Sequence, residues 1–87
     1  MTHKKKSQRE RGVPEGSGTE EDPWFFPDAS SQGEGIAMAH EFMNAAGPEF
    51  GLRKQYLVGM EGDQILEYWE TDSGIFWFRY RMDRDIR

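Results

Sequence analysis

The sequence predicts a small α+β protein with a disordered N-terminal tail, and three observations lead to this expectation. Large apolar side chains are scarce in residues 1–22 and abundant from residue 23 onward. Residues 34–46 show helical periodicity, and three short stretches rich in aromatic and branched apolar residues follow them. Residues typical of tight turns separate those stretches. We therefore expect a tail over 1–22 and one domain over 23–87, built from one helix and a three-stranded antiparallel β-meander.

The tail consists of two blocks of opposite charge. Apart from Met1, its only large apolar residue is Val13, so it has almost nothing to bury and is expected to be disordered. The basic block comprises Lys4, Lys5, Lys6, Arg9 and Arg11. The acidic block comprises Glu15, Glu20, Glu21 and Asp22.

Composition excludes several classes of protein. The chain has 87 residues, a formal net charge of −5 and no cysteine, which rules out disulfide-stapled folds and thiolate metal sites. No apolar run approaches the roughly 20 residues that span a bilayer, and no apolar segment follows the basic N-terminus as in a secretory signal. We expect a cytoplasmic location without membrane association. The acidic balance favours a soluble partner, including a basic one.

Residues 23–27, Pro-Trp-Phe-Phe-Pro, place three aromatic side chains between two prolines. The prolines forbid a regular helix here, so an extended segment is expected. Trp24, Phe25 and Phe26 either complete the domain's own core or form a linear motif for a partner.

The helix is expected over residues 34–46, with Met38, Phe42 and Met43 on one stripe and Gly47-Pro48 ending it. Strands are expected over 55–60, 64–70 and 75–82. Gly62-Asp63 suits a two-residue turn.

A three-residue loop, Asp72-Ser73-Gly74, is expected between the last two strands. This register pairs Glu67 with Arg79 and Trp69 with Trp77, which are favourable cross-strand pairs.

That register sorts the sheet into two apolar faces. The face without charges, with Leu66, Tyr68 and Phe78, is assigned to the helix. The second face needs a covering, which is the 23–27 segment, a second copy in a homodimer, or a foreign partner. Tryptophan, tyrosine and arginine together are typical of interface centres. The candidate partner-binding residues are Trp69, Trp77, Tyr56, Arg79, Arg81, Trp24, Phe25 and Phe26.

No nucleophile, phosphate-loop or metal-ligand pattern is present, so we expect no cofactor, no metal and a function that is not enzymatic. The leading hypothesis is a protein-interaction module, such as a small inhibitor, antitoxin-like protein or adaptor, that binds a protein through the aromatic sheet face. An alternative is RNA or single-stranded DNA binding by Trp77, Arg79, Arg81 and the basic tail.

A further alternative is a small ribonuclease that uses His40 and the arginines. A helix followed by an antiparallel meander with arginines on its last strand is similar in architecture to part of the small ribosome-dependent ribonuclease toxins of the RelE type. The similarity covers residues 34–82 and includes no specific motif.

Overall fold

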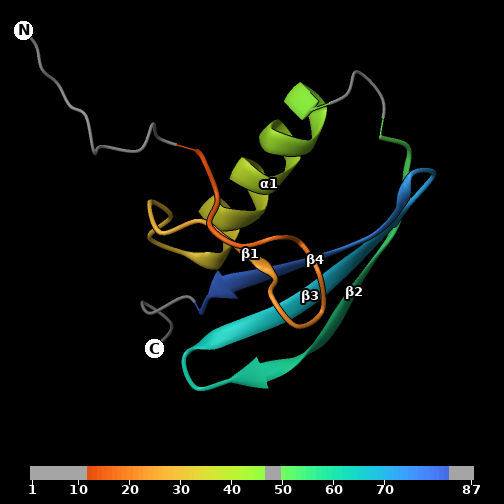
Figure 1. The fold of residues 1–87 in the computed structure, drawn as a ribbon. Coiled ribbons are helices and arrows are strands. Elements are labelled where there is room, and N and C mark those ends of the chain that lie inside the picture. The colour runs from red at the N-terminus through yellow and green to blue at the C-terminus, as the bar shows by residue number, and fades with distance from the viewer. Residues whose placement is uncertain (1–11, 47–49, 83–87) are drawn as a thin grey trace, which may run out of the picture.

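The computed structural model describes residues 12–46 and 50–82, which form one helix packed on a four-stranded sheet (Figure 1). The sheet order is β1-β4-β3-β2, with β1 parallel to β4 and the other pairs antiparallel. The α+β class is confirmed, but the three-stranded meander is wrong because β1 adds a parallel strand. The elements are β1 (Trp24–Phe25), α1 (Gln32–Ala46), β2 (Leu52–Glu61), β3 (Gln64–Thr71) and β4 (Gly74–Arg81).

Helix α1 begins two residues earlier than expected because Ser31 caps it. The Ser31 Oγ accepts a hydrogen bond from the backbone N–H of Glu34 at 3.2 Å. The Glu34 carboxylate in turn accepts from the Ser30 backbone N–H at 2.9 Å and the Ser30 hydroxyl at 2.7 Å. These bonds satisfy donors that a helix start leaves free, in the manner of a capping box.

The core lies between α1 and the face of the sheet formed by β3 and β4. Its aromatic side chains contact one another: Trp69 lies 4.6 Å from Phe78, and Trp24 lies 4.9 Å from Phe42 between ring centroids. Gly35 lets the helix approach the sheet, since a Cβ there would lie 2.8 Å from Cδ1 of Tyr80. The buried apolar residues of this core are Phe26, Ala29, Met38, Ala39, Met43, Trp69, Phe78 and Tyr80.

The first hairpin has the expected two-residue turn, with Glu61 opposite Gln64. The second hairpin differs: Thr71 pairs with Gly74, so its loop has two residues and the predicted three-residue loop is wrong. The Thr71 hydroxyl closes this turn, donating to the Gly74 carbonyl at 2.9 Å and accepting from the Ser73 N–H at 3.1 Å.

This shorter loop exchanges the two faces of β3. Trp69 lies opposite Phe76 and is 0% exposed, and Glu67 lies opposite Phe78 rather than Arg79. Burying a tryptophan removes about 150–250 Å² from water, which is worth roughly 4–6 kcal/mol. An exposed Glu–Arg pair is worth about 0–1 kcal/mol. Tryptophan burial therefore decides the register.

Part of the segment assigned to the tail contacts the sheet. Glu15 and Phe25 exchange two backbone hydrogen bonds, of 2.8 and 2.9 Å. The Trp77 N–H donates to the Gly18 carbonyl at 2.9 Å, so this segment continues along the β1 side of β4. Residues 1–11 lie outside the described part of the chain, and with them the basic block that ends at Arg11.

Candidate interaction surface

The face of the sheet opposite α1, called the open face below, carries a row of aromatic rings that crosses three strands. Tyr56 of β2 stacks on Tyr68 of β3 at 4.7 Å, and Tyr68 lies 4.9 Å from Trp77 of β4, between ring centroids. The cross-strand register places these three directly opposite one another. Each ring is partly exposed. These three residues form the aromatic row.

Cationic side chains flank the aromatic row at both ends. The Lys54 ammonium lies 5.8 Å from the Tyr56 ring centroid, within cation–π range. A hydrogen bond with the Tyr56 side chain raises the pKa of Lys54 above its ordinary value. On the other side Arg79, the next residue of β4 on this face, donates from Nη1 to Oε1 of Gln64 at 3.3 Å.

Arg81 lies on the same face and has a structural role. Its Nε donates to the Ala29 carbonyl at 2.8 Å and its Nη2 donates to the Pro27 carbonyl at 3.3 Å. The guanidinium also lies 5.3 Å from the Phe25 ring centroid. These contacts fasten the connection between β1 and α1 to the end of β4. They occupy donors that a ligand phosphate would otherwise use.

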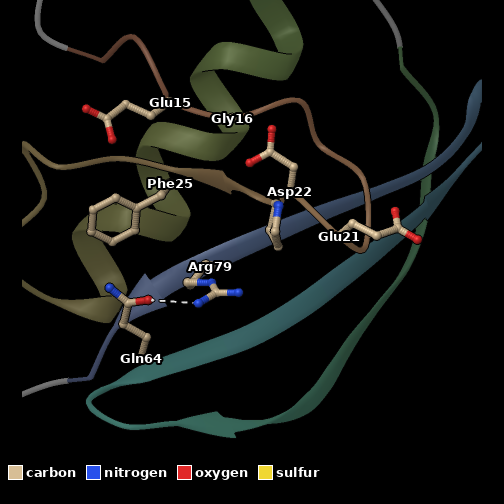
Figure 2. A pocket seen from close by; sticks show the side chains of 8 residues that line it. Glu15, Gly16, Glu21, Asp22, Phe25, Gln64 and Arg79 are labelled. Carbon is tan, nitrogen blue, oxygen red and sulfur yellow. Dashed lines mark hydrogen bonds between the residues drawn. The ribbon is translucent and has the colours of Figure 1, made fainter.

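An acidic hollow lies at Arg79, the residue of β4 that follows Trp77 on the open face (Figure 2). Its volume is about 340 Å³, and Figure 2 shows Arg79 and Gln64 below the acidic side chains of the 15–22 segment. The Asp22 carboxylate is held by the Ser17 hydroxyl at 2.9 Å. The residues that line the hollow are Glu15, Gly16, Glu21, Asp22, Pro23, Phe25, Gln64 and Arg79.

The structure brings some of the predicted partner-binding residues together and separates others. Tyr56, Trp77, Arg79, Arg81 and Phe25 share the open face. The expectation that Trp69 shares a face with Trp77 is wrong, because Trp69 lies buried under α1.

Two further members of the predicted set pack into the core. Phe26 is buried, and Trp24 stacks on Phe76 at 5.7 Å. Tyr68 also lies on the open face, opposite Trp77, whereas the predicted register placed it under the helix.

A buried polar cluster lies on the helix side of β3 and β4. Glu67 is 6% exposed, and its Oε2 accepts from Nε2 of Gln55 at 3.1 Å. By distance and angle, no hydrogen bond from the described residues reaches its Oε1, the Trp69 indole nitrogen or the Tyr80 hydroxyl. Burial raises the pKa of Glu67, against the smaller opposing effects of Trp69, Gln55 and Tyr80, and burial also raises the pKa of Tyr80.

The buried cluster is closed to substrate, since Tyr80 is only 1% exposed. The His40 ring lies 4.5 Å from that of Trp69, so His40 belongs to the helix side of the sheet, away from Arg79 and Arg81. Among the described residues, His40 therefore does not lie beside Arg79 or Arg81, the arginines of the last strand.

Within residues 12–46 and 50–82, no three His, Asp or Glu side chains gather closely enough to hold a metal ion. No helix among the described residues is long and apolar enough to cross a membrane. No protein family, curated protein or solved structure matches the chain.

Proposed function

We propose that this chain is a non-enzymatic interaction module that binds a basic segment of a protein partner on the open face. The observation that carries the proposal is the aromatic row of Tyr56, Tyr68 and Trp77, stacked across three strands on the face that α1 leaves uncovered. Partly exposed tyrosine and tryptophan side chains are the residues that most often dominate binding energy in protein interfaces.

The carboxylates of the acidic hollow favour a basic partner, and they outnumber the two cations, Lys54 and Arg79, that flank the row. Of the described residues that line the hollow, three are acidic, Glu15, Glu21 and Asp22, and Arg79 is basic; the chain as a whole carries a net charge of −5. Lysine and arginine side chains gain from aromatic faces through cation–π contacts and from carboxylates through charge-assisted hydrogen bonds. A basic extended segment would meet both kinds of group along one path.

The nucleic-acid alternative uses the same aromatic row as a stacking platform for bases. The acidic hollow opposes it, because a phosphate backbone next to Glu21 and Asp22 is repelled. Arg81 also has two of its donors committed to backbone carbonyls.

The test is selection of a displayed random-peptide library against the full chain, followed by calorimetry on the enriched peptides. We expect peptides rich in lysine and arginine. Trp77→Ala should weaken them by about 30-fold, which corresponds to ~2 kcal/mol. Glu21→Gln should weaken them less, and Glu41→Ala, on the exposed side of α1, should have no effect.

Tighter binding of a nucleic acid than of any peptide would contradict the proposal. A labelled oligouridylate that binds more tightly than any selected peptide, with an affinity that falls steeply with salt and is lost in Trp77→Ala, would assign the row to nucleic acid. Circular dichroism of each variant establishes that a lost affinity does not reflect a lost fold.

A further inference from the structure

The outer edge of β2 is a second surface, distinct from the open face. β2 is the longest strand, with 10 residues, and it stands at the end of the sheet order opposite β1. Among the described residues, no strand pairs with its outer edge. Such an edge presents a row of backbone N–H and C=O groups that a further strand can bond.

Exposed apolar side chains concentrate on this edge strand. Leu57, Val58 and Met60 are 63%, 50% and 66% exposed. Leu57 lies opposite Glu67 and Met60 opposite Ile65, both of which are buried on the helix side of β3. Helix α1 contacts β4, at the other side of the sheet from β2 (Figure 1), and Leu57 and Met60 stay exposed.

The charges along β2 favour pairing with a second copy of β2 that runs in the opposite direction. Arg53 and Lys54 stand at the start of the strand, where Arg53 also pairs with Asp72 of its own chain at 2.6 Å, and the acidic Asp63 stands in the turn that follows the strand. When two copies of a strand pair antiparallel about a two-fold axis, the start of each lies beside the end of the other. The basic start of each strand then lies toward the Asp63 turn of the other copy, and Leu57 of each copy lies close to the axis.

Two irregularities limit how far such pairing can extend. Arg53 and Val58 have no register partner on β3, so β2 has a bulge at each of these positions. Bulges increase the local twist and shorten the part of an edge that can be paired. The regular stretch between them, Lys54–Leu57, contains the midpoint of the strand.

We propose that two copies of this chain associate through antiparallel pairing of their β2 edges, which joins the two sheets into one. The association uses the strand edge and the helix-side residues Leu57 and Met60. It leaves the aromatic row free. The homodimer therefore does not depend on the function proposed for the open face.

The first experiment is sedimentation equilibrium on the full chain over a concentration series. We expect the apparent mass to rise from the monomer value of 10.1 kDa toward twice that value. Met60→Lys should keep the chain monomeric, because an exposed charge on an edge strand opposes pairing. Ile75→Lys is the matched control, since Ile75 is 55% exposed on β4, and it should dimerise like the wild type.

A second experiment locates the contact. The natural chain has no cysteine, so Leu57→Cys carries a single thiol near the proposed axis, and Ile75→Cys carries one away from it. Mild oxidation should cross-link Leu57→Cys at least about 10-fold faster than Ile75→Cys at equal concentration.

Either of two results would overturn the proposal. One is a wild-type chain that stays monomeric up to ~1 mM. The other is a dimer that survives Met60→Lys with equal cross-linking of the two cysteine variants.

Discussion

Replacing Trp69 and Trp77 in turn separates the observed sheet register from the alternative that the sequence favoured. With a two-residue second loop Trp69 is fully buried under α1, while Trp77 lies partly exposed on the open face. With a three-residue loop both tryptophans would share one face. The two registers therefore predict different costs for the same pair of substitutions.

The magnitudes follow from burial. Truncating a buried tryptophan to alanine costs about 3–5 kcal/mol, which equals the roughly 3–5 kcal/mol that a core of this size supplies. Trp69→Ala is therefore expected to unfold the domain. Trp69→Phe keeps a ring against Phe50 and Phe78 and should cost about 1–3 kcal/mol, whereas Trp77→Phe should cost less than about 1 kcal/mol.

Urea unfolding followed by circular dichroism measures these differences. Midpoints are compared at equal slope, so that a change in the midpoint reports a change in stability. Equal costs for Trp69→Phe and Trp77→Phe, or a larger cost for Trp77→Phe, would refute the register and the burial argument behind it.

Three further predictions concern the core and the helix. Burial raises the pKa of Glu67 above its ordinary value of 4.5. The contribution of Glu67 to the free energy of unfolding should therefore be largest below pH 4.5 and should be lost as the pH rises through the folded-state pKa. Urea titrations across pH 4–8 should show this dependence in the wild type and not in Glu67→Gln. Ser31→Ala should lower the unfolding free energy by about 1 kcal/mol through loss of the cap to Glu34, and Ser31→Asp should restore it. Gly35→Ala should cost about 1–3 kcal/mol in thermal unfolding because its Cβ would meet the Tyr80 ring, whereas Gly33→Ala, with no neighbour within 4 Å, should stabilise the helix.

The helix and the three long strands could be predicted because each shows its own periodicity. The strand β1 could not, since Trp24–Phe25 is two residues long and lies next to Pro23. Proline is tolerated there because Pro23 precedes the strand, so the N–H that it lacks is not part of the ladder.

The predicted register was wrong because it relied on cross-strand pair energies, which are smaller than the energy of burying a tryptophan. Cross-strand pairs such as Glu67–Arg79 differ by about 0.2–1 kcal/mol, too little to outweigh the burial of Trp69. Thr71 was the available signal, since its hydroxyl forms the bonds that close the shorter loop. With that loop, Tyr68 moves to the open face and completes the aromatic row.

The acidic hollow was missed because Glu15, Glu21 and Asp22 belong to a stretch with almost nothing to bury. Backbone hydrogen bonds to Phe25 and Trp77 hold this stretch against the sheet, and backbone bonds leave no trace in side-chain hydrophobicity. Some of the open-face residues of the long strands were therefore predictable from the sequence. The acidic side chains that residues 15–22 add to the same face were not.

The two proposed surfaces meet at Tyr56, which lies on the open face of the edge strand β2. Antiparallel pairing of two β2 edges would bring the two Tyr56 rings near the shared axis and join the two aromatic rows into one. A partner with two basic segments in tandem would then bind with an affinity about 10²–10⁴ times that of a single segment. Met60→Lys, which alters the helix side of the edge, should abolish this gain and leave the affinity for a single segment unchanged. Calorimetry with single and tandem peptides measures both quantities, and a wild-type dimer that gains nothing from the tandem peptide would mean that the two rows are not joined.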